Sequence, residues 1–186
     1  MSHRVALALT LIVTGLAWKP ILDCGFLTDD YQVISIAADW LDLEAGLSVD
    51  NLKRLAGAYA GPVTDRYELL RPSVLVSFGL NLLTTGTHPL PFLITNGVLH
   101  LISTVLLWGL IRRLSPELSA PLTALATALF AVSPLHAEAL AWSAARSDLL
   151  SLLLGLTGLH LVLSGRVWWS LLPLFLAFTA KESALS

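Results

Sequence analysis

The sequence is poor in charge, and long stretches contain no charged residue at all. Only 13% of its residues are Asp, Glu, Lys or Arg, about half the share found in an average soluble domain. In contrast, 55% of the 186 residues are hydrophobic and the mean hydropathy is +0.75. Such a chain has too few polar side chains to cover its surface in water. Residues 1–186 therefore indicate a single membrane domain, since no internal repeat is present.

Two further shortages exclude classes of protein. The net charge is −2 and no basic run is long enough to follow a phosphate backbone, so no nucleic-acid partner is expected. The single cysteine, Cys24, excludes an internal disulfide framework. The existing charges are unevenly placed, because 13 of the 24 lie between Asp23 and Arg71 and nine of these are acidic. This segment is predicted to be a solvated acidic loop.

The charge-poor segments predict an all-α, polytopic membrane protein with about five transmembrane helices. A spanning helix needs about 20 apolar residues, and roughly 17 to 25 are tolerated. The predicted spans are residues 5–22, 92–111, 118–133, 149–165 and 167–180. The last is the weakest, because it is short and contains Pro173. Ser147 and Asp148 are predicted to form the N-cap and first turn of the fourth helix.

Basic residues in the short loops predict the orientation. With the N-terminus inside, the cytoplasmic side holds Arg4, Arg112, Arg113 and Arg166. The same choice exports residues 23–91, in which Ser48 caps a short predicted helix and residues 72–85 form a helix at the outer surface. Two alternatives stay open. Residues 5–22 also fit a cleaved signal peptide, and residues 72–85 also fit a sixth span, which would move Arg112 and Arg113 outside.

Three polar clusters fall on one side of the membrane in this topology. They are Asp29 with Asp30, then His136, Glu138, Arg146 and Asp148, and finally Lys181 with Glu182. Ionisable residues near a bilayer are costly and tend to mark functional sites. Each cluster also has a structural interpretation: Asp148 and Lys181 suit the ends of helices, and the other side chains suit a solvated loop or an interface.

The polar residues inside the spans favour packing roles. His100 and His160 are predicted to be satisfied within the helix bundle, and Asn96, one turn before His100, is placed to pair with it. By contrast, His136 and Glu138 follow Pro134 with a spacing of two residues. That spacing predicts an extended turn with both side chains on one side. With an Asp, this pair is an alternative site for a divalent cation, although two ligands do not define one.

A set of ordered segments resembles a known family. These are FLTDDYQVI, LLRPSVLVSFGLNLL, HPLPFLITNGVLHLISTVLLWGLIRRL, SPLHAEALAWSAARSDLL and LAFTAKES. Together they resemble the N-terminal membrane region of the transmembrane O-mannosyltransferases that carry tetratricopeptide repeats, which are C-type glycosyltransferases. The resemblance covers nearly the whole chain. It implies a polyprenyl-phosphate sugar as donor, an acceptor protein or glycan, and membrane lipid as the surroundings.

The resemblance also assigns site residues. Asp29 and Asp30 match the acidic motif of the first external loop, with Thr28 where relatives often have an aromatic residue. The second external motif matches His136, Glu138, Arg146 and Asp148, and the third matches Lys181 and Glu182. Asp29 is the expected proton acceptor and Asp30 an orienting residue. The leaving phosphate is expected to be bound by Arg146, Lys181, Glu182 and Arg71.

Several alternatives remain at the level of sequence. A transporter subunit would place ionisable residues at mid-depth, whereas here most of them stay at one boundary. A catalytically incomplete fragment or scaffold is the other alternative, because the resembled enzymes continue well beyond the third motif. The host membrane is either the bacterial inner membrane, with a periplasmic or external site, or that of the endoplasmic reticulum, with a luminal site. The sugar, possible metal dependence and oligomeric state stay open.

Overall fold

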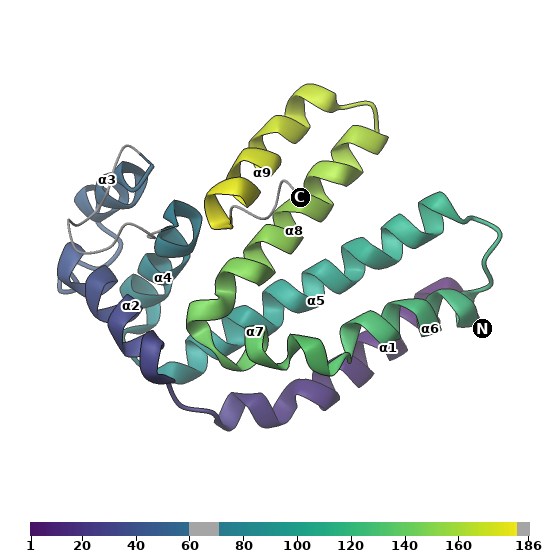
Figure 1. Ribbon diagram of the computed structural model, residues 1–186, viewed down its shortest axis with the longest axis horizontal. Helices are drawn as coiled ribbons and strands as arrows, with labels where there is room; N and C mark the ends of the chain where they lie inside the picture. The colour runs from purple at the N-terminus through teal and green to yellow at the C-terminus, as the bar shows by residue number, and fades with distance from the viewer. Residues whose placement is uncertain (60–70, 182–186) are drawn as a thin grey trace.

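The structure is a computed structural model that describes residues 1–59 and 71–181, without the side chain of Thr28. Throughout these residues the regular elements are all helices (Figure 1). The α-helices are α1 (His3–Trp18), α2 (Thr28–Trp40), α3 (Val49–Gly57), α4 (Pro72–Thr85), α5 (Pro89–Leu114), α6 (Ala120–Ala131), α7 (Ala137–Ala141), α8 (Arg146–Leu163) and α9 (Val167–Ala180). Short 3-10 helices are η1 (Lys19–Asp23), η2 (Pro134–His136) and η3 (Ser143–Ala145). The predicted all-α class is confirmed.

Within residues 1–59 and 71–181, three helical stretches are long and apolar enough to cross a membrane: His3–Asp23, Pro89–Leu114 and Ser143–Leu163. A fourth span results if α6 and the segment Pro134–Ala141, which are bent by 41°, act as one. The apolar helices α4 and α9 have 14 residues each. At 1.5 Å per residue each is about 21 Å long, less than the roughly 30 Å of a bilayer core. The chain is thus an all-α polytopic membrane protein whose predicted fifth span is short.

Helices α1, α5 and α6 pack through small hydroxyl residues. The buried members of this set are Thr10, Thr14, Ser103, Thr104, Thr123 and Thr127. Each hydroxyl donates to the backbone carbonyl four residues earlier, at 2.8–3.1 Å, so no polar atom of the set is left unpaired. Small side chains let helices approach closely where hydrocarbon surrounds them. These three helices run alongside one another in Figure 1.

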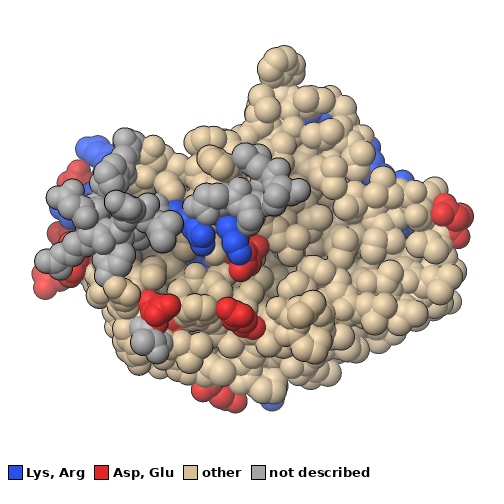
Figure 2. Space-filling model, viewed as in Figure 1, with Lys and Arg blue, Asp and Glu red and all other residues tan. Residues whose placement is uncertain are grey.

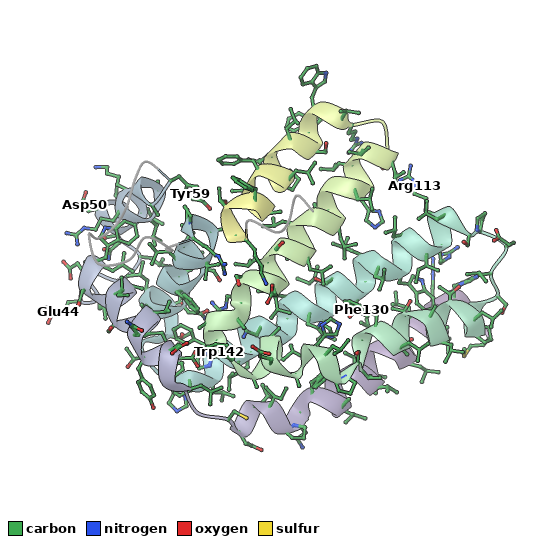
Figure 3. All side chains as sticks on the ribbon, in the orientation of Figure 1. Glu44, Asp50, Tyr59, Arg113, Phe130 and Trp142 are labelled. Carbon is green, nitrogen blue, oxygen red and sulfur yellow. The ribbon has the colours of Figure 1, made fainter. Side chains whose placement is uncertain are left out.

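Helices α8 and α9 form a tight antiparallel hairpin. Gly165, with φ of +74°, makes the turn between them, a backbone conformation that glycine adopts without a steric penalty. A Cβ at Gly158 would come within 2.6 Å of the Leu174 side chain, so a larger residue here would require Leu174 to move. Nearby, Arg113 at the end of α5 donates to Ser164 Oγ at 2.8 Å and to the Leu163 carbonyl (Figure 3). The two arginine-containing loops therefore lie together at one end of the bundle.

Helices α2, α3 and α4 cover the other end. Ser48 Oγ accepts a hydrogen bond from the Asn51 N–H at 3.3 Å, so the predicted cap of α3 is confirmed. Helix α4 also begins and ends where the sequence predicts, at Pro72 and Thr85. Half of its 14 residues are buried, among them Phe78, which belongs to a core shared with α2, α5 and α9. Helix α4 is thus an integral part of the bundle end.

One predicted helix start is wrong. Helix α8 begins at Arg146, with Ala145 as N-cap, because η3 leads directly into its first turn. Ser147 therefore lies inside the helix, where it is buried and its hydroxyl accepts from Arg71 Nη1 at 3.0 Å. Asp148 does lie in the first turn, as predicted, where its negative charge complements the helix dipole.

Candidate active site

Charged residues from distant parts of the chain line one open pocket of about 380 Å³. Its charged side chains are Asp29 of α2, Arg71 before α4, Glu138 of α7, Asp148 of α8 and Lys181 after α9. All five belong to the predicted site. Figure 2 shows basic and acidic side chains close together near the centre of this face. Residues at the start of α2, in α7, at the start of α8 and just after α9 thus form a single polar site. We call this site the charged pocket.

The acidic pair Asp29 and Asp30 splits into two positions. Asp30 is 1% exposed, and its carboxylate accepts from the Leu27 N–H at 2.9 Å and from the Ala144 N–H at 2.6 Å. This carboxylate ties the start of α2 to the turn before α8. Asp29 is exposed and lines the charged pocket. Because neighbouring residues of a helix are about 100° apart, one acid anchors the backbone while the other faces the open space.

The basic side of the charged pocket consists of Lys181 and Arg71. Lys181 Nζ forms an ion pair with Asp148 Oδ1, and both side chains remain partly exposed. Arg71 Nη1 donates to Ser147 Oγ, which holds the guanidinium against the first turn of α8. Two cations therefore lie in the same pocket as Asp29. Glu182, the remaining predicted residue of the third motif, lies outside the described residues.

Arg146 does not line the charged pocket. Its side chain is fully buried and donates four hydrogen bonds: Nε to Asn96 Oδ1 at 2.8 Å, Nη1 to Ser77 Oγ at 2.9 Å and Asn81 Oδ1 at 2.7 Å, and Nη2 to the Phe92 carbonyl at 3.0 Å. The predicted contact with a leaving phosphate has no support in this position. Burying a guanidinium is costly unless its N–H groups are satisfied, and here they join α4, α5 and α8.

The predicted extended turn at His136 and Glu138 is wrong. The segment is helical, with His136 ending η2 and Glu138 in α7. Two residues along a helix turn through about 200°, so the side chains separate. The ring centroids of His136 and Phe130 lie 4.6 Å apart, whereas Glu138 lines the charged pocket. The second external motif therefore contributes Glu138 and Asp148 to the pocket, and not His136 or Arg146.

The polar groups within the spans have partners in the bundle. His100 Nε2 lies 2.8 Å from the Ala131 carbonyl and His160 Nε2 lies 2.8 Å from that of Leu106. The predicted packing role is confirmed for His160, whereas His100 is only partly satisfied, because its buried Nδ1 has no hydrogen-bond partner among the described residues. The expected pairing of Asn96 with His100 is wrong, because the Asn96 amide bonds to Arg146 and to the carbonyls of α7.

The residues that could hold a metal ion are scattered. Over residues 1–59 and 71–181, no three His, Cys, Asp or Glu side chains lie close enough to form a metal site. Among the residues that line the charged pocket but were not assigned to the site from the sequence are Gln32 and Trp142. Gln32 follows Asp29 by three residues, so the helical spacing of α2 was the signal that places both on one face.

The fold and the charged pocket define a class: a polytopic all-α membrane protein with an acidic and basic site at one end of its helices. The chain resembles protein O-mannosyl-transferases. It is 34% identical to protein O-mannosyl-transferase Tmtc1 of Drosophila melanogaster over 89% of the chain and 20% of that protein. It is 30% identical to TMTC3 of Mus musculus over 76% of the chain and 15% of that protein.

A third relative, Tmtc2 of Drosophila melanogaster, is 34% identical over 69% of the chain and 13% of that protein. The chain thus spans about a fifth or less of the length of these curated relatives. No family model matches the chain, and no solved structure matches it. The resemblance first seen in the five ordered segments is confirmed.

Proposed function

We propose that this chain forms the catalytic end of a protein O-mannosyltransferase, which moves mannose from a polyprenyl-phosphate donor to a hydroxyl group of a protein. The names of the relatives support a glycosyltransferase that acts on protein. The single observation that carries the proposal is the charged pocket, in which Asp29 meets Lys181 and Arg71. This reaction needs a carboxylate that accepts a proton and cations that bind a phosphate, all in one place.

Asp29 is the proposed base. As the acceptor oxygen attacks the anomeric carbon, the bond from that carbon to the donor phosphate breaks and its electron pair leaves with the phosphate oxygen. The hydroxyl proton passes to the Asp29 carboxylate. Asp29 suits this task because it is exposed in the pocket. The backbone hydrogen bonds of Asp30 hold the first turn of α2 in place.

Lys181 and Arg71 are the proposed partners of the leaving phosphate. An ammonium group stabilises a phosphate as a point charge, and a guanidinium does so through a two-pronged hydrogen bond. Asp148 holds Lys181 before the donor arrives, and Ser147 holds Arg71. Such prearranged charges contribute about 3 to 4 kcal/mol each when water is excluded. Of the four residues first expected to bind the phosphate, the proposal thus keeps Arg71 and Lys181 and leaves out the buried Arg146.

The charged pocket is proposed to face the periplasm or the lumen of the endoplasmic reticulum. It lies at the end of the bundle opposite Arg113 and Ser164. The positive-inside rule assigns the loops that contain these two residues to the cytoplasm. A Cys24→Ser variant with a single cysteine at Gln32 tests this side. Labelling by a membrane-impermeant reagent in intact cells or opened microsomes supports the proposal, and labelling only from the cytoplasmic side refutes it.

The structure favours this proposal over a transporter. In a transporter the ionisable groups inside the spans line a crossing path. Here His100 and His160 lie against backbone carbonyls, and Asn96 is engaged with Arg146. The exposed charges of the pocket stay at the end of the helices.

The test is Asp29→Asn in the full-length protein, with Asp39→Asn as the matched control. Asp39 is an exposed acid of the same helix that does not line the charged pocket. We expect Asp29→Asn to lower transfer of labelled sugar about 100-fold or more, the usual contribution of a general base, with unchanged membrane accumulation. The control retains full transfer. Equal turnover of the two variants would remove Asp29 from the mechanism.

A further inference from the structure

A second pocket lies between α1 and α5, on the other side of α7 from the charged pocket. It has a volume of about 190 Å³ and an almost entirely apolar wall. Its lining includes Gly15, Trp18, Lys19, Ile94, Gly97 and Val98. We call it the α1–α5 groove. Leu140 of α7 lines this groove, whereas Glu138 lines the charged pocket, so the two spaces are separated by the short helix.

The α1–α5 groove opens on the apolar outer surface of the spans. Large apolar side chains beside it are exposed on both helices, including Ile12 and Leu16 of α1 and Ile94 and Ile102 of α5. In a bilayer this surface meets lipid chains. An apolar cavity of about 150 Å³ stays dry and accepts a benzene-sized molecule. The groove therefore has room for a segment of one hydrocarbon chain, and most of its wall is apolar.

Two glycines leave the groove open. A Cβ built on Gly15 of α1 or on Gly97 of α5 meets no atom within 4 Å. The space directly above both backbones is thus empty, and a Cβ added at Gly97 would enter it without a clash. The groove wall is fixed from behind, because the Trp18 indole N–H donates to the Ala131 carbonyl at 2.7 Å.

A cation stands at the mouth of the groove. Lys19 is exposed where α1 gives way to η1, next to Trp18. Among the described residues, the ion pairs of lysine join Lys53 to Asp50 and Lys181 to Asp148, and Lys19 has no carboxylate partner. Lysine and tryptophan side by side at the end of a span are typical of the level of lipid headgroups. The ammonium group of Lys19 is available for a phosphate there.

We propose that the α1–α5 groove binds an anionic phospholipid of the bilayer, with one acyl chain over Gly15 and Gly97 and the phosphate paired with Lys19. An apolar slot that ends in a single unpaired cation matches a hydrocarbon chain that ends in an anion. None of the residues proposed for the transfer reaction lines this groove. The inference therefore stands whether or not Asp29 is a catalytic base.

The test measures the lipids that remain bound to the full-length protein. The protein is equilibrated with vesicles of equal phosphatidylglycerol and phosphatidylcholine content, purified in mild detergent and examined by native mass spectrometry. We expect the wild type to retain phosphatidylglycerol in preference to phosphatidylcholine. Lys19→Met should lower this preference about fivefold, the contribution of one basic residue at a lipid surface. Gly97→Leu should abolish retention of both lipids.

Two control variants match these substitutions. Arg112→Met removes an exposed cation at the opposite end of the bundle. Gly155→Leu adds the same side chain on α8. A Cβ at Gly155 also meets no atom within 4 Å, and Gly155 does not line the α1–α5 groove. Both should retain lipid as the wild type does. If Gly97→Leu fails to fold, Val98→Trp fills the mouth of the groove from an exposed position.

Two results would overturn the proposal. One is a preference for phosphatidylglycerol that Lys19→Met and the filled groove leave unchanged. The other comes from a photo-crosslinking amino acid at position 98. If it captures another segment of the full-length protein in place of lipid, the groove is an interface between helices.

Discussion

The two sides of the first turn of α8 contain opposite kinds of polar site. Arg146 is fully buried, donates four hydrogen bonds and lies over the rings of Phe78 and Phe92. Asp148, two residues later, is half exposed and pairs with Lys181 in the charged pocket. Two residues of a helix differ by about 200° in direction. The comparison shows that two nearby charges of one motif can have different roles. Arg146 holds helices together in the interior, whereas Asp148 faces the open pocket.

The largest effect is expected from the buried side. Arg146→Met should lower the free energy of unfolding by on the order of 3 kcal/mol, because each buried polar atom left without a partner costs about 1 to 3 kcal/mol. Asn96, Asn81 and Ser77 would all lose the donor that they now share. Thermal unfolding of the full-length protein in detergent measures this loss as a lower midpoint temperature.

Two companions sharpen the result. Arg146→Lys retains the charge but not the planar fork, so it should fall between wild type and Arg146→Met. Arg112→Met removes an exposed arginine of α5 and should leave the midpoint unchanged. A folded, stable Arg146→Met variant that fails only in sugar transfer would contradict the structural role of Arg146. It would support the earlier prediction that Arg146 contacts the leaving phosphate.

A smaller effect is expected at Asp30, which joins the two regions. Its carboxylate accepts one backbone N–H from Leu27 and one from Ala144. In Asp30→Asn the amide group has only one acceptor oxygen, so one of these buried bonds is lost. We expect a loss of about 1 to 3 kcal/mol, again measured by thermal unfolding. Asp39→Asn, at an exposed position of the same helix, should change nothing, and equal midpoints for the two would rule out the anchor.

The sequence predicted the helices better than the roles of their charged residues. Charge-free windows and the Ser48 cap located α1, α3, α4, α5 and α9 because apolar length and capping are local properties. The resemblance also assigned to one site the five charges that line the pocket. The faces that His136 and Arg146 occupy were not predicted, since they depend on where a helix starts.

The error at His136 and Arg146 has this origin. An extended turn was expected after Pro134, but the chain there forms η2 and α7 and then η3, which directs Arg146 inward and His136 toward Phe130. The acceptors that make the inward position tolerable lie about 50 to 70 residues away in sequence, on α4 and α5. Local sequence carries no signal for such distant partners.

The smallest effect on stability is expected at the exposed side of α8, in the ion pair of Lys181 with Asp148. Both side chains are partly exposed, so the pair should contribute only about 0.2 to 1 kcal/mol. A double-mutant cycle of Lys181→Met and Asp148→Asn in thermal unfolding measures this coupling. Sugar transfer should respond far more strongly, because Lys181→Met removes a charge proposed for the leaving phosphate. A coupling above about 2 kcal/mol, together with unchanged transfer, would make this pair structural like Arg146, and the contrast between the two sides of α8 would disappear.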